Sequence, residues 1–299
     1  MKLPGYAVIG LVIIAVSQAG MFMKVEPFWS WHTPIAWTGC ILFADGFVLA
    51  RRGHSWLRDS TAEFVFLGIV SFPLWLIFEF YNLFIRNWHY VNLPASVFWR
   101  DLGYVWSFAT IWPAIFEMAE VVAVLRGPTS GPHAFPARPS GGATPDPTSD
   151  LNPRHRAPQP ISGAGRLSIA VGAVMLAWPL VWPSPYLAAP VWLGFIFLLD
   201  PINARLGGES IIADYRLGRV DRAANLIVAG LACGILWEFW NYWARTRWIY
   251  SVPIFERLKL FEMPLPGYLG FPAFALECFT MYVAVRRLLW HGRLRPVAL

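Results

Sequence analysis

The stretch "WEFWNYWARTRWIY" at residues 237–250 begins in a long apolar segment and ends among charged and aromatic residues. Its Glu238, Asn241 and Arg245 are spaced at i, i+3 and i+7, which places them on one face of a helix. A charged side chain at the centre of a membrane helix costs on the order of 2.5–3.5 kcal/mol on insertion scales. The stretch therefore predicts a membrane helix whose polar face is neutral, paired or in contact with water.

The composition is that of a membrane protein, because 57% of the 299 residues are hydrophobic and only 14% are charged. Most apolar windows approach the roughly 20 residues that a spanning helix needs. We predict an all-α integral membrane protein with about eight transmembrane helices, of which the sixth is the weakest. The windows lie near residues 5–23, 35–50, 64–85, 104–125, 167–183, 187–199, 223–244 and 266–285.

The first window has a second interpretation as a signal peptide, because Lys2 precedes the apolar run and "SQAG" offers small residues for cleavage. We favour a retained helix, since the second half of the chain carries a counterpart.

Arginine clusters follow the second and sixth windows, and others lie in the central segment and at the C-terminus. With eight spans they all fall on one side, so the positive-inside rule predicts a multi-pass cell-membrane protein with both termini and residues 127–165 in the cytoplasm. The loop with Arg245, Arg247, Arg257 and Lys259 lies on the other side, which suggests a different role for these side chains. The net charge of +6 indicates anionic membrane lipids as partners and gives no reason to expect nucleic acid.

The chain carries an internal duplication. "FEFYNLFIRNWHY" at 78–90 matches the opening stretch, with Glu79, Asn82 and Arg86 at the same offsets as Glu238, Asn241 and Arg245. Further matches pair Trp37 and Asp45 with Trp192 and Asp200, and Pro113 and Glu117 with Pro272 and Glu277. We predict two parallel four-helix repeats, 1–126 and 166–299, joined by a flexible Pro/Gly/Ser-rich linker at 127–165.

The matched polar and aromatic residues predict a buried site at the repeat interface. Intramembrane ionisable residues are functional candidates by default. The candidate catalytic residues are Glu79, Glu117, Glu238 and Glu277, which we expect to converge on an internal cavity. The candidate substrate-binding residues are Asn82, Arg86, Asn241, Arg245, Trp75, Trp237, Trp240, Tyr90 and Tyr250.

Structural roles remain open for the same residues. The glutamate faces can be polar contacts between helices, and the tryptophans can be ordinary packing. Pro113 and Pro272 either kink their helices or begin them. Asp45 and Asp200 are expected to form interfacial ion pairs with Arg51 and Arg205.

Metal and cofactor sites are not predicted. Cys40, Cys233 and Cys278 lie in apolar windows without CxxC spacing, so we expect buried thiols. The sequence lacks HExxH and DDxxD patterns, a Walker loop and GxSxG.

The segments "RWIYSVPI" (247–254) and "FPAFALECF" (271–279), with "NWHYVNLP" (87–94) and "WPAIFEMAE" (112–120), resemble the lycopene-cyclase-type membrane domain and small membrane terpene cyclases. The resemblance implies that Glu117 and Glu277 protonate a carbon–carbon double bond of an isoprenoid among Trp and Tyr rings. The chain departs from that pattern in the Pro-to-acid spacing, in lacking an adjacent acid pair and in having four expected helices per half.

Two functions follow from these residues. The first is an enzyme that modifies a lipid or isoprenoid with a glutamic acid as general acid. The alternative is a proton-coupled transporter or a membrane protein that binds a lipid or another apolar or amphipathic small molecule. A purely structural role for the matched residues is the third interpretation.

Overall fold

The computed structural model describes residues 2–127, 161–255 and 257–289. Residues 128–160 of the predicted linker lie outside these ranges. The described part of the chain contains eight helical segments that are long and apolar enough to cross a membrane, by length and composition. The predicted helical class and the eight apolar helices are confirmed to that extent.

The long helices follow the apolar windows with shifts at several ends. They are α1 (Gly5–Phe22), α2 (His32–Arg52), α4 (Thr61–Ile85), α5 (Val97–Ala109), α6 (Ile111–Arg126), α7 (Gly163–Val181), α8 (Ala188–Arg205), α10 (Asp221–Trp243) and α11 (Gly270–Leu289). The window near 104–125 corresponds to α5 and α6 together, which meet at Thr110 and form one apolar span. The second half begins its first helix at Gly163, three residues before the predicted boundary.

Short elements connect the long helices. They are α3 (Trp56–Asp59), β1 (Trp88–Val91), the 3-10 turn η2 (Pro185–Leu187), α9 (Ile211–Arg216), β2 (Arg247–Tyr250), β3 (Lys259–Leu260), β4 (Met263–Pro264) and the 3-10 turn η3 (Leu265–Leu269). β1 pairs antiparallel with β2, and β3 pairs antiparallel with β4.

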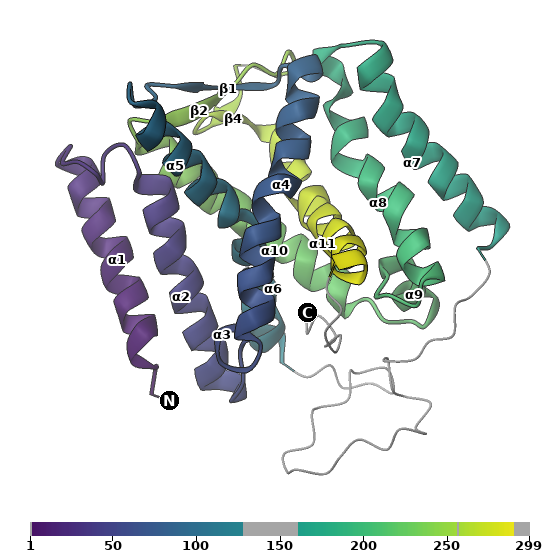
Figure 1. Ribbon diagram of the computed structural model, residues 1–299, viewed down its shortest axis with the longest axis horizontal. Helices are drawn as coiled ribbons and strands as arrows, with labels where there is room; N and C mark the ends of the chain where they lie inside the picture. The colour runs from purple at the N-terminus through teal and green to yellow at the C-terminus, as the bar shows by residue number, and fades with distance from the viewer. Residues whose placement is uncertain (1, 128–160, 256, 290–299) are drawn as a thin grey trace.

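Two outer helix pairs flank a central group (Figure 1). α1 packs on α2 at one side, and α7 packs on α8 at the other. α4, α6, α10 and α11 lie between them, with α2 against α6 and α8 against α11. Figure 1 shows the β1–β2 ribbon at the end of the bundle opposite the start of α1.

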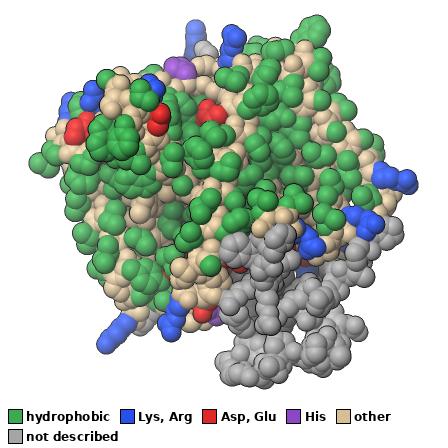
Figure 2. All heavy atoms as spheres, in the orientation of Figure 1, with side chains coloured by type: hydrophobic (Ala, Val, Ile, Leu, Met, Phe, Trp, Pro, Cys, Tyr) green, Lys and Arg blue, Asp and Glu red, His purple; other side chains and the backbone are tan. Residues whose placement is uncertain are grey.

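The outer helices expose apolar side chains, as expected of surfaces that face lipid. Only about a fifth of the apolar windows of α1 and α7 is buried, against two thirds of that of α2. Figure 2 shows hydrophobic side chains over most of the visible face, with most Lys and Arg side chains near its periphery. This surface is compatible with a multi-pass membrane protein.

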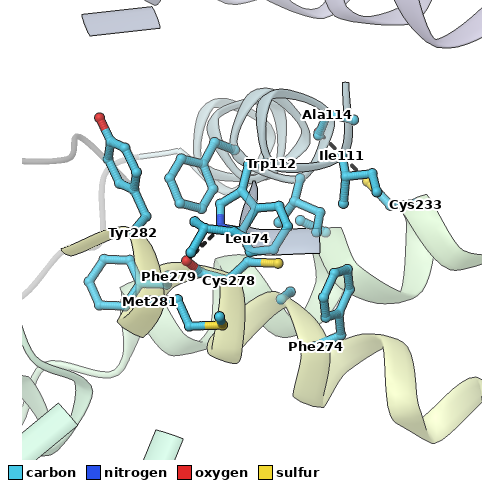
Figure 3. Close-up of a cluster of buried hydrophobic side chains, with 14 of the residues drawn as sticks. Leu74, Ile111, Trp112, Ala114, Cys233, Phe274, Cys278, Phe279, Met281 and Tyr282 are labelled. Atoms are coloured by element: carbon cyan, nitrogen blue, oxygen red, sulfur yellow. Dashed lines mark hydrogen bonds between the residues drawn. The ribbon is translucent and has the colours of Figure 1, made fainter. Parts of the chain in front are cut away.

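Part of the hydrophobic core lies where α6, α10 and α11 meet (Figure 3). The fully buried indole of Trp112 donates a hydrogen bond to the Cys278 carbonyl oxygen at 2.9 Å. Phe274 lies edge-on to Trp112, with ring centroids 5.7 Å apart. Cys40, Cys233 and Cys278 are buried and free, in agreement with the expected buried thiols.

Both aspartates expected in ion pairs instead bind the start of the short helix that follows, α3 or α9. Asp45 accepts hydrogen bonds from the Ser55 hydroxyl at 2.9 Å and the Leu57 amide at 2.9 Å. Asp200 accepts bonds from the Ser210 hydroxyl at 2.7 Å and the amides at 211 and 212. The expected pairs with Arg51 and Arg205 are therefore wrong, because the chain after each helix folds back and supplies closer donors.

The prolines lie in the first helical turns. Pro113 is the third residue of α6, and Pro272 is the third residue of α11. Of the two interpretations, the one in which they begin their helices fits this placement, since a proline in the first turn removes no intrahelical hydrogen bond.

Candidate functional site: an aromatic cavity beneath the β1–β2 ribbon

A cavity of about 500 Å³ lies between the two halves of the chain, a size typical of small-molecule sites. Its floor and walls come from the long helices of both halves, and the β1–β2 ribbon forms part of its lining. Aromatic rings dominate this lining. They belong to Trp31, Trp37, Trp75, Trp88, Tyr90, Tyr104, Phe108, Trp192, Trp237, Trp248, Tyr250, Phe271 and Phe274.

Asn82 turns the chain from α4 into β1. Its Nδ2 donates to the Trp88 carbonyl oxygen at 2.8 Å, and its Oδ1 accepts from the Asn87 amide at 2.9 Å. Arg86, between these groups, caps the helix in the left-handed conformation with φ of 52°. The asparagine thus satisfies backbone groups freed where the helix ends.

Asn241 makes the same arrangement after α10. Its Nδ2 donates to the Trp248 carbonyl oxygen at 2.8 Å, and its Oδ1 accepts from the Trp248 amide at 2.9 Å. The two predicted binding asparagines therefore hold the strands that line the cavity, and neither is part of the lining itself.

Glu79 accepts hydrogen bonds from three aromatic side chains of the cavity lining, hereafter the aromatic wall. Its Oε1 accepts hydrogen bonds from the Tyr90 hydroxyl at 2.5 Å and from the indole nitrogens of Trp75 at 2.8 Å and Trp88 at 3.2 Å. The three donor side chains all line the cavity. The carboxyl therefore lies behind the wall and fixes the orientation of the rings.

Glu238 occupies the corresponding place behind β2. Its Oε1 accepts from the Tyr250 hydroxyl at 2.9 Å and from the Trp248 indole at 3.4 Å, and that indole also lies 2.9 Å from the Tyr250 oxygen. The Glu238 side chain is fully buried, and its Oε2 has no hydrogen-bond partner among the described residues.

The tyrosine hydroxyls remain protonated over the usual pH range. Burial, followed by the neighbouring Glu79 carboxyl, raises the pKa of Tyr90 well above its ordinary value of 10.0. Burial and the Glu238 carboxyl raise the pKa of Tyr250 in the same direction. Each pair thus presents a neutral phenol at the cavity and a carboxyl behind it.

The four candidate glutamates do not meet at one cavity, and none of them is among its described lining residues. Glu277 is buried on α11, where its Oε1 accepts from the Phe195 amide at 3.1 Å. Glu117 is buried on α6 beside Asp45 of α2. The expected convergence is wrong because Glu277 is bound by the Phe195 amide of α8 and Glu117 is buried between α6 and α2, away from the cavity lining.

The polar helix face predicted for Glu, Asn and Arg does not include Arg86 or Arg245. α4 ends at Ile85 and α10 ends at Trp243, so Arg86 and Arg245 fall outside the helices. Both are exposed and neither lines the cavity. Arg245 forms an ion pair with Glu26 at 3.2 Å and lies over the Trp29 ring, 5.1 Å from its centroid.

The three candidate tryptophans divide between wall and core. Trp75 and Trp237 line the cavity. Trp240 is buried outside the lining and packs edge-on against Trp37, with ring centroids 5.0 Å apart. Tyr90 and Tyr250 line the cavity as well.

Several lining residues were not among the candidate site residues named from the sequence. They are Trp31, Trp88, Arg100, Tyr104, Arg247 and Trp248. The repeated Trp-x-Tyr at 88–90 and 248–250 was the signal available in the sequence, since its tryptophan and tyrosine recur together.

Comparison with models of protein families, with curated proteins and with solved structures finds no match to this chain.

Proposed function

We propose that this chain is a polytopic membrane protein of two parallel four-helix repeats, and that the cavity between them binds a lipid or an isoprenoid and modifies it by proton transfer. The observation that carries the proposal is the pair of tyrosine hydroxyls at the cavity wall, each hydrogen-bonded to a glutamate behind it. In this proposal both termini lie on the cytoplasmic side.

The ribbon register supports the duplication. Trp88 lies opposite Tyr250, and Tyr90 lies opposite Trp248. Exchanging the two halves converts each of these pairs into the other, as a twofold axis through the ribbon requires.

Equivalent contacts elsewhere support the same relationship. Asp45 binds the hydroxyl ten residues further on, and Asp200 does the same. Arg126 at the end of α6 binds Asp221 at the start of α10, with 3.3 Å between the charged atoms. Arg286 near the end of α11 binds Glu63 near the start of α4 at 2.7 Å.

The chemistry follows from the Tyr–Glu pairs. When the carboxyl is protonated and donates to the phenol oxygen, the phenol O–H is free to pass its proton to a substrate carbon while the carboxyl proton replaces it. The products are a carboxylate, an unchanged tyrosine and a substrate cation. Loss of a proton from this cation to the second pair gives an isomerised or cyclised product of unchanged composition.

The aromatic wall suits such an intermediate. The faces of Trp and Tyr rings stabilise a cation, and an apolar cavity keeps out water that would trap it. Trp37 and Trp237, with ring centroids 4.9 Å apart, lie in the lining beside Phe274.

The test compares lipid extracts from cells with the wild-type protein, the Tyr90→Phe/Tyr250→Phe double variant or no protein. We expect a lipid whose abundance depends on the wild-type protein and not on the double variant. Tyr186→Phe is the matched control, because Tyr186 is exposed and outside the cavity lining. A lipid profile that is the same in all cells, determined by mass spectrometry, would count against an enzyme.

A proton-coupled transporter is the second candidate. It is favoured by Glu277, a buried carboxyl on the helix that also contributes Phe271 and Phe274 to the cavity. This function predicts substrate-dependent proton uptake in proteoliposomes that Glu277→Gln abolishes, with no chemical change in the substrate.

A further inference from the structure

The charged side chains among the described residues that line the cavity are all positive. Its described lining residues include two arginines, Arg100 and Arg247, and no aspartate, glutamate, lysine or histidine. Arg100 lies in the first turn of α5, and Arg247 is the first residue of β2, so both belong to the end of the cavity near the connecting segments.

The deeper end of the cavity is apolar. Trp37, Thr110, Ile111 and Phe274 lie within or beside the spans of α2, α6 and α11. The cavity therefore changes from cationic near the ribbon to aromatic and aliphatic toward the bundle interior, which matches an amphiphile with one charged end.

Neither arginine is fully neutralised where it stands. The Arg100 Nε lies 3.6 Å from the Asp101 carboxylate, and both side chains are partly exposed. Arg247 donates to the Tyr242 carbonyl oxygen at 2.6 Å and lies 3.6 Å from Glu262. Its Nε is buried and has no hydrogen-bond partner among the described residues. A guanidinium has five donors, so each arginine retains donors for a ligand.

We infer that the cavity takes an amphiphile with an anionic end group, a phosphate or a carboxylate, which Arg100 and Arg247 hold while the aromatic wall takes its apolar chain. The inference rests on the proposed binding function and adds the charge of the ligand. A cationic ligand would place its charge beside two arginines, although the rings alone would favour it.

The experiment measures binding to the full-length protein in nanodiscs of zwitterionic lipid, with the tryptophan fluorescence of the cavity as readout. The probes share a dodecyl chain and differ in the end group: dodecyl phosphate, dodecanol and dodecyltrimethylammonium. We expect dodecyl phosphate to bind at least about tenfold more tightly than either of the others, since hydrogen bonds to charged groups are the strong ones.

Arg100→Gln and Arg247→Gln should each remove much of that preference and leave dodecanol binding unchanged. Arg86→Gln is the matched control, because Arg86 is exposed and outside the cavity lining. Competition by inorganic phosphate would indicate a free anion as the ligand source, whereas competition by phosphatidylglycerol in the nanodisc would indicate a lipid headgroup.

Two outcomes overturn the inference, and they differ in what they say of the cavity. Equal binding of the phosphate and the alcohol, weakened by Trp75→Ala, would reject the anionic end group and retain a binding cavity. Binding of all probes that is insensitive to Trp75→Ala, or no binding of any probe, would reject the proposed function together with this inference.

Discussion

Tyr90 and Tyr250 lie on neighbouring antiparallel strands, and the hydroxyl of each donates a hydrogen bond to a glutamate on the helix that precedes its strand, Glu79 or Glu238. Each carboxyl lies behind the cavity wall and each phenol forms part of it. The carboxyl groups of Glu79 and Glu238 are thus reached through a tyrosine, which distinguishes this arrangement from a cavity lined directly by acids.

The raised tyrosine pKa values predict a loss of stability in alkali. Tyr90 and Tyr250 ionise near pH 10.0 when unfolded and well above it when folded, so the unfolded state releases protons first. Their contribution to the free energy of unfolding is constant below that pH and declines above it, by roughly 1.4 kcal/mol per pH unit and tyrosine. The Tyr90→Phe/Tyr250→Phe variant should show a shallower decline, measured by denaturant unfolding in detergent.

Tyr186→Phe serves as the control for that comparison, because Tyr186 is exposed. An alkaline slope in the double variant equal to that of the wild type would show that the two phenols are not protected by folding.

The asparagines that hold the ribbon predict two matched losses of stability. Asn82→Ala and Asn241→Ala each remove a donor to a tryptophan carbonyl and an acceptor for a backbone amide. We expect each variant to lose about 1–3 kcal/mol in the free energy of unfolding, the range for partners left unsatisfied. His89→Ala, at an exposed position of β1, should change it by less than about 0.5 kcal/mol. A loss confined to one asparagine would contradict the equivalence of the two turns.

The spans could be predicted from the sequence because length and hydropathy are local properties. Even so, the window at 187–199 was too short: α8 continues to Arg205 through the buried Asp200 and Asn203. These polar residues ended the apolar window, although Asp200 is satisfied by Ser210 and the first two amides of α9, and the Asn203 amide donates to the Thr280 carbonyl oxygen. Tertiary contacts decided the helix length there.

The candidate site was predictable only in part for the same reason. The repeated offsets of Glu and Asn identified residues that hold the cavity wall. The same helical spacing also predicted that Arg86 and Arg245 lie on the helix face, and this was wrong. The helices stop before these arginines because each asparagine binds backbone groups of the strand that follows. The two strands pair although Trp88 and Tyr250 stand 162 residues apart in the sequence. Pairing of residues so distant leaves no local signal.

Removal of Arg286 predicts a large loss of stability. Its guanidinium is 1% exposed and binds Glu63 at 2.7 Å and Glu209 at 3.1 Å. Arg286→Met leaves two carboxylates without this partner, and breaking a buried pair costs about 3–5 kcal/mol. The exposed pair of Arg245 and Glu26 provides the contrast, since Glu26→Gln should cost about 1 kcal/mol or less. Both values come from unfolding in detergent.

Replacing Glu63 and Glu209 by glutamine in the Arg286→Met background should restore part of the loss, because no buried carboxylate is then left unpaired. If the triple variant is no more stable than Arg286→Met alone, the loss arises from packing and not from charge.

The outer helix pairs predict a strict requirement for glycine at two positions. A Cβ atom at Gly10 would lie 2.5 Å from the Gly39 carbonyl oxygen, and one at Gly172 would lie 2.4 Å from the Leu198 amide nitrogen. Both obstacles are backbone atoms of the neighbouring helix, so alanine must push α1 from α2 or α7 from α8. We expect each alanine variant to lose about 1–3 kcal/mol, as overpacking does.

Gly163 is the matched control on α7, because a Cβ atom there meets nothing within 4 Å. Gly163→Ala should be neutral or should stabilise by up to about 1 kcal/mol, since alanine restricts the unfolded chain. The three variants are compared by thermal melting in one detergent. Because the clashes at Gly10 and Gly172 are with backbone, shortening a neighbouring side chain should not rescue either variant, whereas rescue by such a change would show that the helices lie further apart.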